Sequence, residues 1–256
     1  MMSGTLARLC ENSRRALQEG IYDTGDAGER SDIRMSEALQ TREIAIISEI
    51  KFASPSLGTI RDTQDPGEVA TQMVQGGAVA ISVLTQPYLF GGSPEYLAQV
   101  RKVVRVPILM KDIVVDAIQI EAARRLGADC ILLIQAVFDA GHAHDMDGMI
   151  DTAHGYGMQV LAEVHDTHEL ESALATKCDI IGVNNRNLDT LEISLETTKR
   201  VLAGYADHRP AISESGIESS SDIAYLKGCG ASAFLVGTGI MRHGNVKGGV
   251  RRLVES

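Results

Sequence analysis

Residues 46–58 read IISEIKFASPSLG, and the rest of the chain can be interpreted outward from this stretch. The β-branched apolar part, 44–50, predicts a buried strand, and the Ser/Pro/Gly-rich part predicts a loop. Because strand side chains alternate between two faces, Glu49 and Lys51 lie on the same face where the strand ends. The two charges form either a structural ion pair or part of a site for a polar ligand, and their apolar surroundings favour the site.

The same pattern of strand, loop and helix recurs along the chain. Seven further short apolar runs follow the first, at 78–84, 106–110, 130–134, 159–164, 180–183, 211–213 and 233–236. These runs are apolar throughout, as is typical of parallel strands covered by helices. Eight such units predict a closed (β/α)8 TIM barrel of the α/β class. The alternative, an open doubly wound sheet, usually has fewer strands and often a GxGxxG motif after the first strand, which is absent here.

Helix start and stop signals separate the strands. Helices are predicted to begin after the capping residues Asp65, Ser93, Asp116, Asp166 and Ser194. Asp166 and Glu169 are spaced as in a capping box, and the helix after Ser194 is expected to end near Gly204. These signals predict helices in the intervals between the apolar runs.

Length and composition indicate one domain spanning residues 1–256. With 44% hydrophobic and 23% charged residues, the chain resembles folded globular proteins and not disordered ones. Residues 1–40 precede the first strand and carry helical spacing, with a second segment starting at Ser31 or Asp32. Two such short amphipathic segments cannot fold alone, so we expect an N-terminal helical extension packed on the barrel.

Net charge, cysteine spacing and apolar runs indicate which partners and which cellular compartment to expect. A formal net charge of -10 argues against a nucleic-acid binder or an anionic-membrane binder. The four cysteines are widely scattered, which is typical of reduced thiols in a cytosolic protein. The N-terminus lacks the build of a signal peptide, and no apolar run reaches membrane-spanning length. We therefore expect a cytoplasmic protein that does not contact a membrane.

Polar side chains gather where the predicted strands end. They are Glu49, Lys51, Lys111, Glu163, Asn184, Arg186, Glu214 and Ser215. The C-terminal ends of the strands form the active-site face of such a barrel, so these groups converge at one mouth. A lysine beside apolar walls and a second lysine can have a lowered pKa, and a glutamate beside other glutamates a raised one. A general acid and a general base could then coexist near neutral pH.

Glycine-rich turns after the last two strands indicate a phosphate site. Ser215-Gly216-Ile217 and Gly237-Thr238-Gly239 expose backbone N–H groups where barrels often hold a phosphate, although glycine there also serves tight packing. Ser54 and Ser56 add hydroxyl donors. The predicted ligand is a phosphorylated small molecule.

Four histidines are interpreted as solvated surface and not as metal ligands: His142, His144, His165 and His168. The sequence indicates no metal, flavin or nicotinamide, so neither a metal nor a cofactor is expected.

The motifs together resemble the indole-3-glycerol phosphate synthase family, a barrel enzyme of tryptophan biosynthesis. The matching segments are 49–58, 108–112 (ILMKD), 161–164 (LAEV), 182–188 (GVNNRNL), 213–217 (SESGI) and 235–238 (LVGT). The N-terminal extension is similar too, so the resemblance covers nearly the whole chain. That family converts 1-(2-carboxyphenylamino)-1-deoxyribulose 5-phosphate to indole-3-glycerol phosphate by ring closure, decarboxylation and dehydration.

The resemblance implies a role for each candidate residue. Lys111 would be the general acid for ring closure, and Glu163 with Lys51 would transfer protons in the dehydration. Which lysine acts at which step stays open. Glu49, Asn184 and Glu214 would orient the charged groups and hydrogen-bond the substrate's hydroxyls. Ser215 is a further candidate catalytic residue. The substrate-binding residues are Phe90, Leu188 and Leu191 for the anthranilate ring, Ser54, Gly216, Gly237 and Thr238 for the phosphate, together with Arg186 and Leu235.

Two rival functions remain on sequence grounds. One is another phosphosugar barrel, such as an isomerase of the same pathway. The combination of Glu49-x-Lys51 with the following Ser-Pro-Ser disfavours it. The other is a catalytically silent barrel kept as a scaffold subunit, which has no physical need for Lys51, Lys111, Glu163 and Glu214. As partners we expect only the small-molecule substrate, with a monomer or weak homo-oligomer and no nucleic acid.

Overall fold

The chain folds around a closed barrel of eight parallel strands. The computed structural model describes residues 4–25, 30–54, 58–60, 65–242 and 244–255. The strand order around the barrel is β1-β10-β9-β8-β7-β6-β5-β4. These strands are β1 (Ala45–Ile50), β4 (Ala80–Leu84), β5 (Ile108–Lys111), β6 (Cys130–Ile134), β7 (Gln159–Val164), β8 (Ile180–Asn184), β9 (Ala211–Glu214) and β10 (Ala233–Val236). The predicted (β/α)8 TIM barrel is confirmed.

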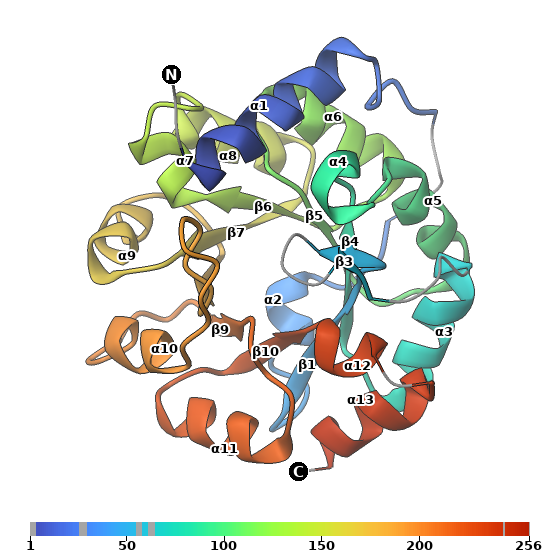
Figure 1. Ribbon diagram of the computed structural model, residues 1–256, viewed down its shortest axis with the longest axis vertical. Helices are drawn as coiled ribbons and strands as arrows, with labels where there is room; N and C mark the ends of the chain where they lie inside the picture. Colours follow the sequence, from blue (N-terminus) through green and yellow to red (C-terminus); the bar gives the residue numbers. More distant parts are fainter. Residues whose placement is uncertain (1–3, 26–29, 55–57, 61–64, 243, 256) are drawn as a thin grey trace.

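Helices surround the strands, as Figure 1 shows. They are α1 (Thr5–Gln18), α2 (Met35–Ala38), α3 (Pro66–Gly76), α4 (Pro87–Phe90), α5 (Pro94–Val103), α6 (Ala117–Leu126), α7 (Gln135–Asp139), α8 (Met146–Gly155), α9 (Thr167–Leu174), α10 (Glu196–Val201), α11 (Ser220–Gly228), α12 (Thr238–Met241) and α13 (Val246–Val254). A small hairpin of β2 (Ala53–Ser54) and β3 (Gly58–Thr59) follows β1. None of the helices in the described ranges is both long and apolar enough to cross a membrane.

The alternation of strand side chains divides the core into two layers. Ile47, Leu109 and Leu161 belong to a cluster inside the barrel. Their neighbours Ile46 and Ile108 belong to a larger cluster between the strands and the helices. Because alternate residues share a face, the inward series continues into the polar residues at the strand ends. The fold therefore directs those residues toward the barrel axis.

Most of the predicted helix caps are confirmed. The side chains of Asp65, Ser93 and Asp116 each accept hydrogen bonds from backbone N–H groups of the helix that follows. Asp166 also caps α9, through the N–H of Glu169. The predicted capping box is wrong in its second half, because the Glu169 carboxylate accepts from the N–H of His165 and not from that of Asp166.

The cap predicted at Ser194 is wrong. Helix α10 begins at Glu196, and its N-cap residue, Leu195, makes no side-chain hydrogen bond to the first turn. The helix ends at Val201, before Gly204. The N–H of Ser194 instead donates to the carbonyl oxygen of Asn185, which holds this segment as a loop. The Asn185 side chain accepts from the N–H of Thr198 and so satisfies a donor in the first turn.

The N-terminal extension packs on both ends of the barrel. Leu9 and Cys10 of α1, and Met35 of α2, belong to the apolar cluster inside the barrel. The second helix does not begin at Ser31 or Asp32: the N–H of Ser31 donates to Asp129, and α2 starts only at Met35. The backbone N–H of Ser31 thus binds Asp129 just before β6 and does not begin a helix.

Candidate active site

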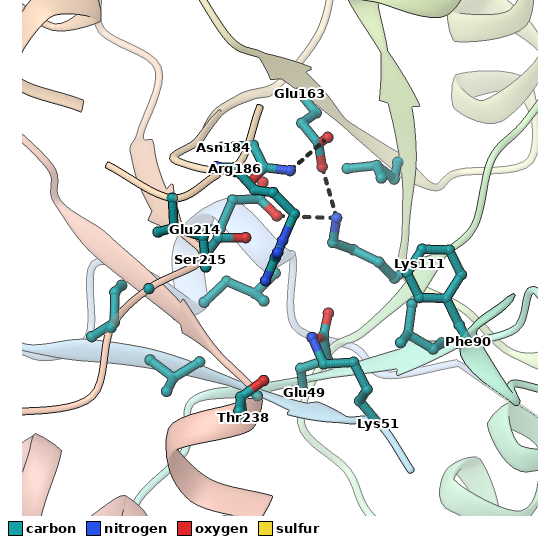
Figure 2. A pocket seen from close by; sticks show the side chains of 18 of the residues that line it. Glu49, Lys51, Phe90, Lys111, Glu163, Asn184, Arg186, Glu214, Ser215 and Thr238 are labelled. Atoms are coloured by element: carbon teal, nitrogen blue, oxygen red, sulfur yellow. Dashed lines mark hydrogen bonds and ion pairs between the residues drawn. The ribbon is translucent and has the colours of Figure 1, made fainter. Parts of the chain in front are cut away.

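A cavity of about 460 Å³ opens at the C-terminal ends of the strands. Its lining includes every predicted site residue except Ser54. Ser54 ends β2, but its side chain, like all of Ser56, lies outside the described parts of the chain. Figure 2 shows the charged members of this lining facing one another across the cavity.

Lys111 lies at the centre of the charged cluster. Its Nζ is 2.7 Å from Oε2 of Glu163 and 3.0 Å from Oε2 of Glu214 (Figure 2). The three side chains come from the last layer of β5, β7 and β9. Asn184, at the end of β8, donates its Nδ2 to the other oxygen of Glu163 at 3.0 Å. Side chains from β5, β7, β8 and β9 thus form one group linked by hydrogen bonds and ion pairs.

The charges in this group shift one another's pKa values. Burial alone would lower the pKa of Lys111, but the surrounding carboxylates, led by Glu163 and Glu214, raise it above its usual value. The predicted lowering of a lysine pKa is therefore wrong for Lys111, because carboxylates and not a second lysine surround it. Burial works to raise the pKa of Glu163, yet Lys111 and His165 hold it well below its usual range.

The predicted raised glutamate is found at Glu214. Burial raises the pKa of its carboxyl to about 7, with Lys111 opposing the rise and Glu163 adding to it. Oε1 of Glu214 is buried without a hydrogen-bond partner among the described residues. Three ionisable groups in contact therefore titrate over very different ranges, which suits a site that both gives and takes protons.

Glu49 and Lys51 form a second pair on the opposite side of the cavity. The Nζ of Lys51 is 2.5 Å from Oε1 of Glu49, and both side chains line the cavity. The two interpretations of this pair, a structural ion pair and part of a ligand site, are compatible. The two side chains form the ion pair, and both also line the cavity. Lys51 is the more accessible partner, with 18% of its side chain exposed against 4% for Glu49.

Arg186 extends over the cavity from the loop after β8. Its Nη1 donates to the carbonyl oxygen of Leu191 at 3.0 Å, and its N–H donates to Oδ1 of Asn184. Ser215 adopts a left-handed backbone conformation with φ of 69°, and its carbonyl oxygen accepts from Asn185. Loop backbone and side chains thus hold one another in place around the mouth.

An apolar wall and two glycine turns complete the cavity. The apolar residues are Leu9, Leu84, Phe90, Ile113, Leu132, Ile134, Leu188, Leu191, Ile193, Ile217, Leu235 and Val236. Gly216 has φ of +80°, and a Cβ there would lie 2.5 Å from Ile193. A Cβ on Gly237 would lie 2.6 Å from Oε1 of Glu49. Both glycines leave room at the rim that a side chain would fill.

Two neighbours of the charged cluster have no role in the sequence analysis. His165 is not solvated surface: its ring lies 2.9 Å from Oε2 of Glu169 and 3.4 Å from Oε1 of Glu163. Its position two residues after Glu163, on the same strand face, was the signal that could have revealed it. Asp112, next to Lys111, is buried and accepts from Tyr22 Oη at 2.8 Å and from Thr85. His168, by contrast, is exposed as predicted.

Comparisons with known proteins agree on a family. The family model described as indole-3-glycerol phosphate synthase matches residues 10–253. The indole-3-glycerol phosphate synthase of Azoarcus sp. (strain BH72) is 46% identical over 212 residues, 82% of this chain and 79% of that protein. The enzyme of the same name from Azospirillum brasilense is 37% identical over 264 residues, 99% of this chain and 100% of that protein.

A solved structure shares the fold alone. Thiamine phosphate pyrophosphorylase from Pyrococcus furiosus aligns with a TM-score of 0.62 at 14% identity, over 85% of this chain and 96% of that one.

Fold and site define a (β/α)8-barrel enzyme with acid–base side chains at the C-terminal mouth of the barrel. The chain belongs to the indole-3-glycerol phosphate synthase family. It is thus a ring-closing, decarboxylating lyase of tryptophan biosynthesis that acts on a phosphorylated small molecule.

Proposed function

We propose that Lys111 is the general acid of ring closure, acting on 1-(2-carboxyphenylamino)-1-deoxyribulose 5-phosphate. The observation that carries this proposal is the position of its ammonium in the cavity, between Glu163 and Glu214. Ring closure joins the carboxylate-bearing ring carbon to the ketone carbon, so the ketone oxygen must gain a proton. A buried ammonium kept charged by carboxylates can donate that proton. Carbon dioxide then leaves and restores the aromatic ring.

Glu163 and Lys51 handle the dehydration in this proposal. The hydroxyl formed by ring closure leaves as water after receiving a proton, and the neighbouring CH₂ carbon loses a proton to form the indole double bond. The strongly lowered pKa of Glu163 favours its anionic form, which a base needs, and Lys51 faces the same cavity as an ammonium donor. Whether Lys51 or Lys111 protonates the leaving hydroxyl is decided by the experiment below.

The remaining predicted residues bind and orient the substrate. Polar contacts to its hydroxyl groups come from Glu49, Asn184, Glu214 and Ser215. The anthranilate ring lies against Phe90, Leu188 and Leu191, and the phosphate lies among Ser54, Gly216, Gly237 and Thr238. Leu235 is a further substrate-binding residue. Arg186 pairs with an anionic group of the substrate. Support comes from the common cavity, which all of these residues except Ser54 line.

The test is a steady-state fluorescence assay of indole formation in EDTA, with Lys51→Ala, Lys111→Ala and Glu163→Gln beside the wild type. We expect kcat to fall at least about 100-fold in each variant while the circular dichroism spectrum is kept. Single-turnover traces separate the lysines: loss of Lys111 blocks decarboxylation, and loss of Lys51 lets the hydroxylated intermediate accumulate. Lys102→Ala, at an exposed position of α5, is the matched control. Full activity of Lys111→Ala would overturn the assignment.

We further propose that residues 1–256 form a single domain that works in the cytoplasm as a monomer or weak homo-oligomer. Four free cysteines, three of them buried, suit a reducing compartment. Apolar contacts of α1 and α2 with the barrel interior support one unit including residues 1–40. Light scattering after gel filtration and a single urea-unfolding transition by two probes are the tests. A stable tetramer or two separate transitions would contradict the proposal.

A further inference from the structure

His165 is a half-buried side chain, with a buried Nε2, next to the cluster of Lys111, Glu163 and Glu214. The proposed steps of ring closure and dehydration give it no role. It follows Glu163 by two residues, so both side chains point to the same side of the chain at the end of β7. Only 13% of its side chain is exposed. A polar ring buried beside a catalytic carboxylate needs partners, and these partners indicate what it does.

The ring of His165 bridges two carboxylates. Its Nδ1 lies 2.9 Å from Oε2 of Glu169, and the same oxygen accepts from the His165 backbone N–H at 2.8 Å. Its Nε2 lies 3.4 Å from Oε1 of Glu163 and has no hydrogen-bond partner among the described residues. Glu169 thus fixes the ring so that its second nitrogen faces Glu163.

The surroundings of the ring favour an imidazolium ion. Burial works against its charge, but Glu163 and Glu169 outweigh burial and raise the pKa of His165 to about 10. The elements packed against α9 are β7, α7 and α10. Their other charged side chains do not ion-pair with the ring: Asp139 of α7 accepts from Gln135, and Glu196, Lys199 and Arg200 of α10 are exposed.

Glu163 therefore has two cationic neighbours, one on each carboxylate oxygen. Lys111 contacts Oε2, while His165 and the neutral amide of Asn184 face Oε1. If Lys111 turns toward the substrate carbonyl to protonate it, its contact with Glu163 is lost. The carboxylate then stays buried with one remaining cation, that of His165.

We propose that His165 is a positioning residue that keeps Glu163 ionised and oriented when Lys111 engages the substrate. This inference rests on the proposed roles of Lys111 and Glu163. In this proposal His165 stays a counter-charge of Glu163 throughout the reaction, whereas Lys111 is one only until it engages the substrate. Glu169 orients the His165 ring through its contact with Nδ1 and is thus a second positioning residue.

The experiment compares pH profiles of kcat and of kcat/KM for wild type, His165→Asn and Glu169→Gln. Asparagine keeps a hydrogen-bond donor and removes the charge. The pH profile of kcat reports groups in the substrate complex, where Lys111 has moved. We therefore expect the apparent pKa of the acid limb of kcat to be about one unit higher in His165→Asn than in the wild type. The acid limb of kcat/KM should stay within a few tenths of a unit, since Lys111 still pairs with Glu163 in the free enzyme.

Glu169→Gln separates charge from packing. In this variant the imidazole of His165 remains protonated at acidic pH, so the acid limb of kcat should match that of the wild type. The pKa of the His165 ring, followed by NMR, should fall from about 10 by at least one unit. His168→Asn, at an exposed position of the same helix, is the control and should leave both profiles unchanged. If His165→Asn does not fold, His165→Gln, which also keeps a hydrogen-bond donor and removes the charge, replaces it in both pH profiles.

The outcomes are distinct. An acid limb of kcat that is unchanged in His165→Asn, or a uniform loss of kcat at every pH that is shared by Glu169→Gln, would mean a structural role only and overturn the inference. Unimpaired turnover of Glu163→Gln would instead overturn the proposed function on which the inference rests. A raised acid limb in His165→Asn alone supports both.

Discussion

The ammonium of Lys111 lies 2.7 Å from a carboxylate oxygen of Glu163, deep in the mouth of the barrel. Glu214 approaches the same ammonium from the other side at 3.0 Å. One cation therefore holds two buried carboxylates together without a substrate. Removal of this ammonium is expected to be strongly destabilising, because it leaves two buried carboxylates without their shared counter-charge.

Lys111→Met is expected to destabilise the protein most at alkaline pH. Without the ammonium, the pKa of Glu214 rises above about 7, and that of Glu163 rises too. A carboxyl with a raised folded-state pKa contributes stability at low pH and loses it as pH rises, because the folded state binds its proton more tightly. We expect a loss of about 3 kcal/mol at pH 8.5 and a much smaller one at pH 5.5, by urea denaturation. Equal losses at both pH values would contradict this charge argument.

Glu214→Gln is expected to stabilise the protein while slowing it. The folded pKa of Glu214 is about 7 against a usual 4.5, so its contribution to stability is present below pH 4.5 and lost as pH rises through 7. Glutamine removes the ionised form, and we expect a gain of roughly 1 kcal/mol at pH 8.5 that vanishes near pH 4.5. Thermal unfolding across this range measures the gain, and kcat should fall at least about tenfold. A lower unfolding temperature at pH 8.5 would show that the carboxylate stabilises the fold.

Tyr22→Phe tests how the N-terminal extension supports the strand that carries Lys111. The Tyr22 hydroxyl donates to the buried carboxylate of Asp112, whose pKa burial raises to about 6. Loss of the donor raises that pKa further, so we expect a destabilisation of about 1–3 kcal/mol that grows as pH rises through 6. Tyr156→Phe, at an exposed tyrosine, is the matched control and should change stability by less than about 0.5 kcal/mol. Equal effects of the two variants would contradict the role of this hydrogen bond.

Gly237→Ala tests the close approach at the proposed phosphate rim. Gly237 has an ordinary φ of -113°, so alanine meets no backbone strain, but its Cβ would lie 2.6 Å from Oε1 and 3.2 Å from Cβ of Glu49. Glu49 must shift, and we expect KM to rise at least about tenfold with little change in the unfolding temperature. Gly228→Ala, where nothing lies within 4 Å of the new Cβ, is the control. An unchanged KM in Gly237→Ala would mean that Glu49 yields without consequence for binding.

Local signals predicted the strands and most helices well. The β-branched runs coincide with the barrel strands within two residues at each end, because continuous apolar character marks a strand buried on both faces. The errors fall where a long-range contact replaced a local one. Asn185 satisfies the start of α10 in place of Ser194, and Asp129 binds the N–H of Ser31 before α2 can begin. No local pattern contains either partner.

The sequence predicted which residues line the cavity, but not their pKa values. Strand ends and motif resemblance identified the residues that line the cavity. A lowered lysine pKa, which the sequence suggests for a lysine near a second lysine, is not found at Lys111, whose pKa is raised. Sequence order does not say which of several charges lie nearest. His165 was assigned to the surface, since a histidine at a helix start is usually solvated. Its contact with Glu163 and its burial follow from how α9 packs on the barrel.

The sequence by itself determined the barrel and most of the polar residues that line its mouth. Periodicity and turn chemistry are local properties, and the ends of parallel strands must meet at one edge. Only the tertiary structure decided that Lys111 sits between Glu163 and Glu214, that Lys51 pairs with Glu49, and that His165 is enclosed by carboxylates. Electrostatic energies depend on distance and burial, which the closure of the barrel sets for residues far apart in the chain.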